Sequence, residues 1–394
     1  MSRERARATV DARVETTLRP LSAFEEAEAG NGTTPSVQWS QSKPPALDFF
    51  AGGGLASEAL RSSFSIVWAN DICEKKAETY SANHPAEKLT VGSIEDVRGQ
   101  DLPYAALSWA SFPCQDLSLA GNLHGIESSR SGLVWEWLRV MDEMEFRPKV
   151  VVAENVVGLV SASQGRHYLA LHAALSDRGY RVGAVVLDAA RWVPQSRARV
   201  FVVGVASTNI PNTLVAEGPT WCHNTAVARI AEHAHDFVWW TLREPRRKPR
   251  ALQQIVDFRV PTHTEPQSKR NLGLIPPHHR SRMDAQVNCQ ANVFPGYKRT
   301  RGGKQVLELR FDNKAGCLRT PQGGSSRQYL VLCKDGNRFT RLVTVREAAR
   351  LMGVRDSYRV IGSYNEGYKA MGDGVAVPVV RYLARQLLLP LAEI

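Results

Sequence analysis

The chain has 394 residues, of which 43% are hydrophobic, and it carries a formal net charge of +11 at pH 7. This length allows one large domain and a smaller one. Because no run of 18 apolar residues occurs and the N-terminus lacks the apolar core of a secretory signal, we expect neither a transmembrane helix nor export. The cysteines show no CxxC or metal-ligand spacing, so we expect reduced thiols in a cytoplasm and no metal site: Cys73, Cys114, Cys222, Cys289, Cys317 and Cys333.

Residues 1–44 are polar, with mixed charges and an Asn31-Gly32 break, and we expect a poorly ordered arm there. From Ala46 onward, strand and helix patterns alternate, which predicts a parallel sheet with helices on both faces. A longer, non-helical stretch joins the last two strands, so antiparallel pairing is open at that edge. The predicted strands are 46–50, 65–70, 107–112, 150–155, 182–187 and 200–205, and the predicted helices are 55–63, 73–83, 133–145 and 168–178.

The composition changes after Val205. Pro, His, Arg and Gly become frequent and periodicity stays poor until Thr344, which predicts a second, smaller and more irregular region. Thr241–Arg310 holds 15 Lys and Arg against 5 Asp and Glu. Such a basic block favours a polyanion partner, most simply nucleic acid, although a solvated surface has the same composition. Beyond it, a capping box at Thr344 opens a predicted helix over 344–353, and an amphipathic pattern predicts another over 375–388.

A candidate nucleophile follows one of the predicted strands. Cys114, in Pro113-Cys114-Gln115, comes directly after the apolar run 106–112. A buried parallel strand brings this cysteine to the carboxyl edge of the sheet, where open α/β sheets bind ligands, and the proline keeps it on a loop. The alternative is that Cys114 packs in the core as a small hydrophobe, as most free cysteines do.

A glycine-rich turn and an acidic residue predict a nucleoside cofactor. Asp48-Phe-Phe-Ala-Gly-Gly-Gly54 joins the first strand to the first helix, so N–H groups at a helix N-terminus can approach a ligand closely. Asp71, 19 residues beyond Gly52, ends the second strand, where a carboxylate can accept hydrogen bonds from ribose hydroxyls. The turn matches neither GxGxxG nor a phosphate loop, and the alternative is a tight turn with a helix-capping aspartate.

Two further polar motifs lie at the ends of predicted strands. Glu154-Asn155 closes the strand 150–155, and a buried carboxylate there is costly unless it is paired or used. Gln195-x-Arg197-x-Arg199 leads into the last strand, and alternation places both arginines on one face, where they can hold a phosphate or a pyrimidine carbonyl. The alternative for the arginines is a solvated pair on an edge strand.

The order of these motifs resembles that of the DNA cytosine-5 methyltransferase family, from about residue 46 to the C-terminus. The resemblance implies a Rossmann-like α/β sheet that binds S-adenosylmethionine, with a smaller irregular domain for target recognition. It places a catalytic, cofactor-binding domain over 45–205 and 365–394 and a DNA-binding domain over 206–364, with the arm 1–44 outside both. The motifs that carry it are Asp48–Gly54, Asn70-Asp71-Ile72, Phe112-Pro113-Cys114-Gln115, Glu154-Asn155-Val156, Gln195-Ser-Arg197-Ala-Arg199, Arg341–Leu351 and Gly372-Asp-Gly-Val375.

This resemblance implies a reaction on double-stranded DNA in which a cytosine is flipped out and methylated at C5. The Cys114 thiolate would add to C6, a protonated Glu154 would donate to N3, and Arg197 or Arg199 would bind O2.

The resemblance also implies the residues that contact the cofactor. Ser93 stands where the family usually has an aspartate, and Asp373 stands where asparagine is commoner, so both contacts depart from the family pattern. The implied contacts are Phe50, Gly52, Gly54, Asp71, Ile72, Ser93, Ile94, Pro113, Asp373 and Val375.

As partners, the resemblance implies duplex DNA and a restriction endonuclease. It also implies a monomeric enzyme of the bacterial cytoplasm, which reaches the nucleoid through DNA and contacts no membrane.

Two alternative functions stay open. A tRNA-acting branch shares these motifs, although one large RNA family has a second cysteine where this chain has Glu154. An inert DNA-binding regulator on the same scaffold is the other, but such a protein has no need of the Cys114 thiol. We expect the segment Ala315–Gln328 either to contact DNA phosphates or to form a structural turn.

Overall fold

The computed structural model describes residues 42–113, 132–246, 248–287, 292–319, 327–334 and 336–394. The chain divides into a first unit, Met1–Pro35, and a second, Ser36–Ile394, and every described residue belongs to the second. The expectations for residues 1–41, for Cys114 and for 320–326 lie outside the described residues.

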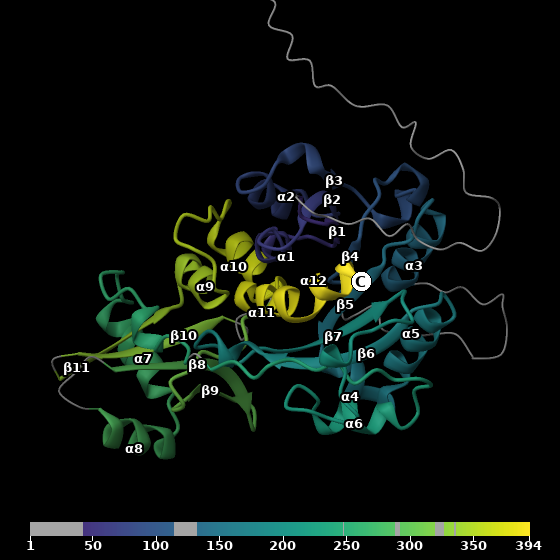
Figure 1. Cartoon of the computed structure of the whole chain (residues 1–394). Helices are drawn as coiled ribbons and strands as arrows, with labels where there is room; N and C mark the ends of the chain where they lie inside the picture. Colours follow the sequence, from purple (N-terminus) through teal and green to yellow (C-terminus); the bar gives the residue numbers. More distant parts are fainter. Residues whose placement is uncertain (1–41, 114–131, 247, 288–291, 320–326, 335) are drawn as a thin grey trace, which may run out of the picture. The chain divides into compact units, whose positions relative to one another are not determined.

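A seven-stranded sheet in the order β3-β2-β1-β4-β5-β7-β6 forms the centre of the fold (Figure 1). The strands from β3 to β5 run parallel, and β7 runs antiparallel to both β5 and β6. The predicted α/β alternation is therefore confirmed. At the edge formed by β7 and β6, where the sequence did not decide the direction of pairing, the strands are antiparallel. The strands are β1 (Pro45–Phe49), β2 (Ser65–Asp71), β3 (Leu89–Val91), β4 (Leu107–Ala110), β5 (Val150–Val156), β6 (Arg181–Asp188) and β7 (Ala198–Val205), of which β3 is too short to show a pattern in the sequence.

Helices cover both faces of this sheet because its buried strands present apolar side chains alternately to each side. In β5, Val150 and Val152 belong to one apolar cluster, whereas Val151 and Ala153 belong to the other. The first cluster includes α1 and α11, which pack against each other, and the second includes α3 and α5. These helices, with those between them, are α1 (Leu55–Leu60), α2 (Glu74–Ser81), α3 (Leu133–Glu143), α4 (Gly158–Ser161), α5 (Arg166–Ser176), α6 (Thr225–Ala231) and α11 (Val377–Leu383).

The C-terminal helices are part of the same core. α9 (Val345–Leu351) begins at the predicted capping box, and α10 (Tyr364–Asp373) precedes α11 and α12 (Leu389–Glu393). By length and composition alone the helical run Tyr364–Glu393 could cross a membrane. However, 61% of its most apolar window is buried, and its leucines pack in the cluster around the sheet, which is typical of a core helix.

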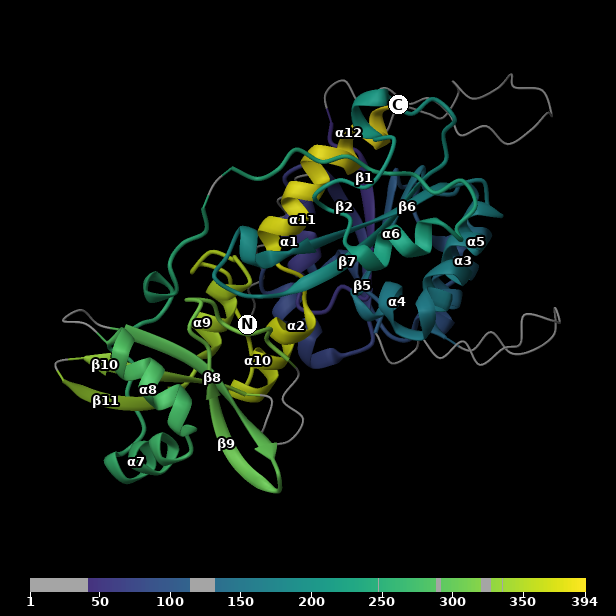
Figure 2. The ribbon, with the colours of Figure 1, turned by 90° about the horizontal axis from the view of Figure 1, so that it is seen from below.

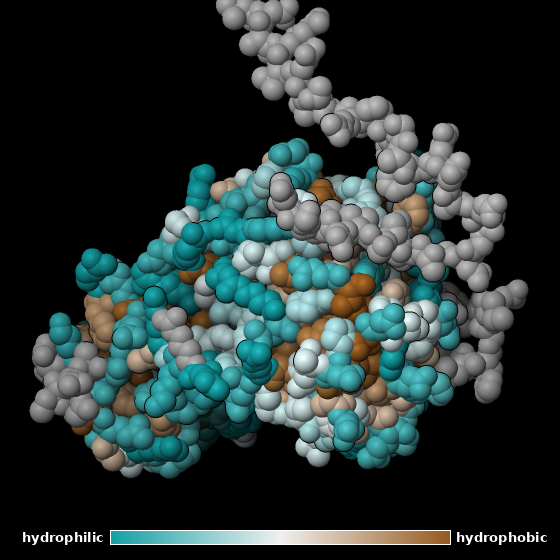
Figure 3. Space-filling model, in the orientation of Figure 1, coloured by the Kyte–Doolittle hydropathy of each residue, from teal (hydrophilic) through white to brown (hydrophobic). Residues whose placement is uncertain are grey.

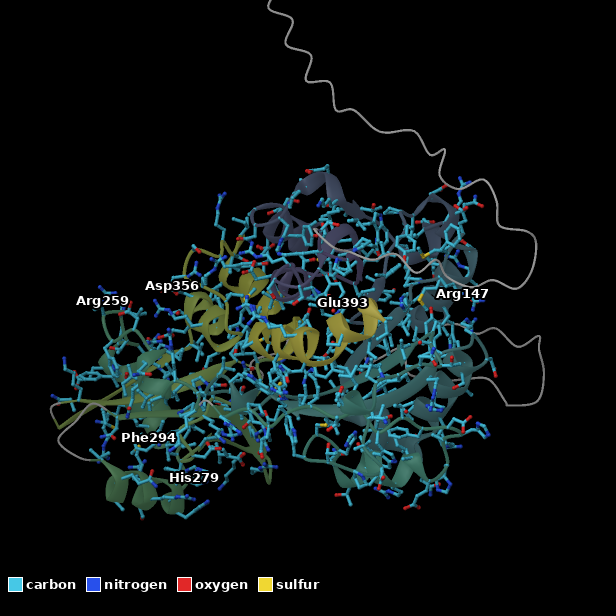
Figure 4. The ribbon with its side chains drawn as sticks, in the orientation of Figure 1. Arg147, Arg259, His279, Phe294, Asp356 and Glu393 are labelled. Carbon is cyan, nitrogen blue, oxygen red and sulfur yellow. The ribbon has the colours of Figure 1, made fainter. Side chains whose placement is uncertain are left out.

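A four-stranded antiparallel sheet in the order β11-β10-β8-β9 lies in the region where periodicity was poor. Its apolar core includes Phe294 of β8, and His279 of α8 accepts a hydrogen bond from the main chain of Leu309; both side chains are labelled in Figure 4. The elements are α7 (Glu265–Gly273), α8 (Pro277–Gln286), β8 (Asn292–Arg301), β9 (Lys304–Leu309), β10 (Gln328–Lys334) and β11 (Asn337–Leu342).

These strands are missing from the predicted elements because Pro295-Gly296, inside β8, resembles a turn. The structure gives the glycine a different role: a Cβ at Gly296 would lie 2.6 Å from the main-chain oxygen of Glu308, so only glycine lets β9 approach β8 so closely.

The chain order of the strands reverses between β1 and β4, which lie side by side in the sheet. Such a switch point leaves a crevice at the carboxyl ends of the strands. The residues that follow β1, β2, β4 and β5 therefore meet at one edge, where the predicted motifs stand.

Candidate active site

A cavity of about 800 Å³ opens at this edge of the sheet. Its walls come from the ends of β1, β2, β4 and β5, the start of β7, the end of α10 and the segment Cys317–Arg319. Among the residues predicted for the site, the cavity is lined by Phe50, Gly52, Asp71, Ile72, Ser93, Ile94, Pro113, Glu154, Arg197, Arg199, Asp373 and Val375. Of the predicted residues that the structure describes, Gly54 is not in this lining. Cys114 lies outside the described residues, directly after Pro113. Gly54 is the last residue of the turn and adopts φ 83°, and a Cβ there would clash with the His84 side chain at 2.6 Å.

One end of the cavity has the features of a nucleoside site. Asp71 is held in place because its two carboxylate oxygens accept hydrogen bonds from the main-chain N–H groups of Gly52 and Cys73, both at 2.8 Å. Phe50 adopts a left-handed conformation (φ 59°) at the start of the glycine turn. The side chain of Ile72 is 71% exposed and offers an apolar surface to the cavity. An anchored carboxylate, a bare glycine turn and an apolar side chain fit the ribose and base of a nucleoside cofactor.

Asp48 lies in β1, one residue before the strand ends, and is fully buried. Its Oδ2 accepts a hydrogen bond from the Ser57 hydroxyl at 2.6 Å, and no described residue bonds to its Oδ1. Burial raises the pKa of Asp48 to about 7, against the effect of the Ser57 hydrogen bonds, which lower it.

Replacing Asp48 with asparagine is expected to reduce the pH dependence of stability. The carboxyl group binds a proton up to about pH 7 in the folded protein but ionises near 3.8 in the unfolded chain. The folded state therefore holds more protons between these values, so the free energy of unfolding falls as pH rises, by at most about 4 kcal/mol. Urea unfolding at pH 5 and pH 8 should show a smaller fall for Asp48→Asn than for the wild type or for Asp101→Asn, an exposed control. Equal falls in all three proteins would contradict this assignment.

The Glu154 carboxylate faces Arg199 because of the antiparallel pairing of β5 with β7. Val156 is paired with Arg199 and Glu154 with Phe201, so Glu154 and Arg199 are diagonal neighbours on one face. Their side chains form an ion pair, with Arg199 Nε 3.2 Å from Glu154 Oε1. Burial nevertheless raises the pKa of Glu154, while the two arginines and the Ser111 hydroxyl oppose the shift. A carboxyl group held in this way can carry a proton and donate it.

Asn155 links this strand to the loop that carries Pro113. Its side-chain amide donates a hydrogen bond to the main-chain oxygen of Phe112 at 2.9 Å, in a buried position. The described segment that ends at Pro113 is therefore held close to the end of β5, where Glu154 stands.

Arg197 and Arg199 have different surroundings, which the sequence did not distinguish. Arg197 is buried, and its Nη atoms donate to the main-chain oxygens of Leu318, Gly372 and Gly374 at 2.6–3.0 Å and to Cys317 Sγ. All four Nη hydrogens are thus used within the protein. Burial lowers the pKa of Arg197 to about 10, so it stays charged at neutral pH.

Gln195 docks the segment 315–319 beside Arg197. Its side-chain oxygen accepts from the main-chain N–H of Leu318 at 3.1 Å, and its main chain forms a parallel bridge to Ala315. The first part of the segment expected to contact DNA or form a turn thus lines the cavity, whereas residues 320–326 lie outside the described residues.

Replacing Arg197 with methionine is expected to destabilise the protein. The change removes the guanidinium donor from three main-chain oxygens, of which that of Leu318 keeps a contact from the Cys317 thiol. At a cost of about 1–3 kcal/mol for each oxygen left without a donor, the free energy of unfolding should fall by about 2 kcal/mol or more. Urea unfolding measures this loss, and Arg98→Met is the control because the Arg98 side chain is 72% exposed and its ion pair with Asp101 lies at the surface. Equal losses for the two variants would show that Arg197 does not hold the site together.

The two departures from the family pattern lie in the cavity wall. Ser93 Oγ caps a short 3₁₀ turn by accepting from Glu95 N at 3.2 Å. Asp373 forms an ion pair with Lys76 of α2, at 2.8 Å between Asp373 Oδ2 and Lys76 Nζ. Sequence reasoning did not single out Lys76 or Ser111, because neither carries a motif signal. Within the described parts of the chain, no group of three or more His, Cys, Asp or Glu side chains could hold a metal ion.

Comparison with known proteins gives one consistent result. The family model "C-5 cytosine-specific DNA methylase" matches residues 45–389. The chain is 25% identical to the type II methyltransferase M1.ScrFI of Lactococcus lactis subsp. cremoris, over 87% of this chain and 77% of the relative. It is 26% identical to the type II methyltransferase M.FnuDI of Fusobacterium nucleatum, over 86% of this chain and 93% of that protein. Among solved structures, the fold is similar to that of the S. pombe Dnmt2 methyltransferase, with a TM-score of 0.55 and 17% identity over 86% of this chain and 97% of the other.

Proposed function

The chain belongs to the C-5 cytosine-specific DNA methylase family and is a DNA cytosine-5 methyltransferase, and from this premise we propose that it methylates a flipped-out cytosine within a specific double-stranded sequence, using S-adenosylmethionine and a covalent bond from Cys114. One observation carries the proposal: the Glu154–Arg199 pair and the loop ending at Pro113 share a cavity with the glycine turn and Asp71. A target cytosine and a nucleoside cofactor can therefore bind next to each other in one cavity.

The cofactor would lie against the glycine turn, Asp71 and Ile72, and when bound it supplies a methyl group on a sulfonium sulfur. C5 of cytosine is too weak a nucleophile to take this methyl group unaided. The Cys114 thiolate forms a bond from sulfur to C6, and the electrons displaced from the ring make C5 nucleophilic. C5 would take the methyl group, whose bond to the sulfonium sulfur breaks so that a neutral thioether leaves. The C5 proton then leaves to solvent, the sulfur–C6 bond breaks and the thiolate is regenerated.

Glu154 and Arg199 stabilise the charge that this addition creates. A protonated Glu154 donates to N3 as the thiolate adds and takes the proton back when the thiolate leaves. Arg199, which keeps N–H groups that are not used by main-chain oxygens, binds O2. We assign Arg197 a positioning role instead, because its Nη hydrogens are used within the protein.

The proposal needs DNA contacts outside the cavity, since the target base must leave the duplex. We propose that residues 206–364 supply these contacts, while residues 45–205 and 365–394 hold the cofactor. Helix α9 falls within 206–364 but packs against α10 and into the core of the large sheet. Hydrophilic surface covers much of the face drawn in Figure 3. Exposed basic residues of α7, α8 and the β8–β9 hairpin include Lys269, Arg270, Arg280, Arg282, Arg301 and Lys304, and such residues suit phosphate contacts.

Because several relatives are type II methyltransferases, we propose that the enzyme is the modification partner of a restriction endonuclease. It would act as a monomer in the bacterial cytoplasm and reach the nucleoid through DNA.

Methyl incorporation into duplex DNA and into tRNA, measured side by side with labelled S-adenosylmethionine, tests the proposed substrate. We expect label at C5 of cytosine in duplex DNA at one sequence, which methylation sequencing of cells expressing the protein would identify. Label in tRNA alone would overturn the DNA proposal. Label in neither, together with tight DNA binding, would identify an inert regulator.

A further inference from the structure

One ion pair stands in the wall of the cavity without a part in the proposed chemistry. Lys76 of α2 and Asp373 at the end of α10 are 2.8 Å apart, and their side chains are 18% and 27% exposed. Figure 2 shows α10 beside α2, and the two helices are in contact. Both residues line the cavity, so each charge lies where a ligand can reach it.

The pair lies next to the turn and the carboxylate that fit the nucleoside. A Cβ built on Gly52 would be 3.8 Å from Cδ of Lys76 and 4.0 Å from Oδ2 of Asp71. A nucleoside whose ribose reaches Asp71 and whose base reaches Ile72 has its 5′ substituent near the glycine turn. In S-adenosylmethionine that substituent ends in an α-amino acid, which carries one ammonium and one carboxylate group.

We propose that Lys76 and Asp373 together bind the amino acid end of S-adenosylmethionine, Lys76 through the carboxylate and Asp373 through the ammonium group. This inference rests on the proposed function. In the protein alone the two side chains satisfy each other, which limits the cost of holding two partly buried charges. On binding, the ligand carboxylate replaces Asp373 as the partner of Lys76, and the ligand ammonium group replaces Lys76 as the partner of Asp373. Charge-assisted hydrogen bonds to the protein then compensate for the hydrogen bonds that the ligand loses to water.

The charge of Asp373 needs a partner if this part of the cavity is to bind a carboxylate. An aspartate alone would repel the cofactor carboxylate. Lys76 offsets that charge at 2.8 Å and supplies a cation for the carboxylate. The two positions are therefore expected to depend on each other, as residues in direct contact do.

Calorimetric binding of four ligands by the full-length protein tests the inference. S-adenosylmethionine and S-adenosylhomocysteine carry the whole amino acid, decarboxylated S-adenosylmethionine lacks only the carboxylate, and 5′-methylthioadenosine lacks both charges. For Lys76→Met we expect binding of the first two ligands to weaken by about tenfold or more, and binding of 5′-methylthioadenosine to stay unchanged. The wild-type preference for S-adenosylmethionine over its decarboxylated form should disappear in Lys76→Met and return in Lys76→Arg.

The neighbouring Lys75 is the matched control, since it belongs to the same helix but is 62% exposed and paired with Glu78. Lys75→Met should bind all four ligands as the wild type does. Asp373→Asn should keep the preference for the carboxylate but weaken binding of decarboxylated S-adenosylmethionine, whose amine it no longer attracts.

Equal weakening of all four ligands in Lys76→Met would overturn the inference, because the lysine would then support the nucleoside site or the fold. Unchanged binding of all four would also overturn it and leave the pair a link between helices. In both cases a wild type that binds S-adenosylmethionine leaves the proposed function standing. A wild type that binds none of the ligands would overturn the cofactor proposal as well.

Discussion

Replacing Cys114 with serine is expected to abolish methyl transfer while leaving binding to duplex DNA largely intact. A thiol ionises near pH 8.5 and the thiolate is strongly nucleophilic, whereas a serine hydroxyl is a far weaker acid, stays protonated at neutral pH and attacks C6 poorly. Single-turnover incorporation of labelled methyl groups measures the loss, and a gel-shift titration measures DNA affinity.

The matched control is Cys333→Ser, which makes the same replacement of sulfur by oxygen. Cys333 lies in β10 of the four-stranded sheet, outside the cavity lining. This variant should transfer methyl groups at a rate close to that of the wild type. Full activity in Cys114→Ser would refute the assigned nucleophile, and loss of DNA binding in that variant would show that the change disturbs more than one atom.

Replacing Glu154 with glutamine is expected to lower the single-turnover rate by about 10²- to 10⁴-fold, the usual contribution of a positioned general acid. Glutamine keeps the length and planarity of the side chain beside Arg199 but has no acidic proton to give to N3. Burial raises the pKa of Glu154, which favours the protonated form that this step needs.

Binding of DNA and of S-adenosylmethionine by Glu154→Gln should change little, because neither needs the proton. Glu136→Gln, at a partly exposed carboxylate of α3 paired with Arg139, is the control and should keep the full rate. An unchanged rate in Glu154→Gln would remove Glu154 from the mechanism.

The sequence was sufficient to predict the large sheet and much of the edge where the site lies. Apolar runs such as 150–153 are long enough to identify buried strands, and parallel strands bring their ends together wherever they fall in the chain. Asp71 and Glu154 could therefore be placed at one edge from their positions at the end of β2 and within β5. The antiparallel register of β5 and β7 decides which arginine meets Glu154, and no local pattern reports a register.

The four-stranded sheet could have been found in part. Gly302-Gly303, both with positive φ, form the two-residue turn of the β8–β9 hairpin, and a Gly-Gly pair between strands is a known hairpin signal. The Pro295-Gly296 pair masked it, because proline and glycine inside a strand usually mark a break.

The contacts around Arg197 and Lys76 could not be predicted, for a different reason. Arg197 meets main-chain oxygens more than 100 residues away, at Leu318 and Gly372, and main-chain oxygens carry no sequence signal. Lys76 lies in the polar helix α2, where a lysine is usually solvated, and only the packing of α10 beside α2 gives it a partner. Both contacts follow from tertiary packing.

Trapping on duplex DNA that carries 5-fluorocytosine at the target site tests the covalent step most directly. Once C5 bears both methyl and fluorine, no proton can leave from it, so the bond between sulfur and C6 cannot break. With S-adenosylmethionine present, we predict a stable protein–DNA adduct, and mass spectrometry of its peptides should place the DNA on Cys114. No adduct under conditions in which normal DNA is methylated, or an adduct on another residue such as Cys317, would contradict the account.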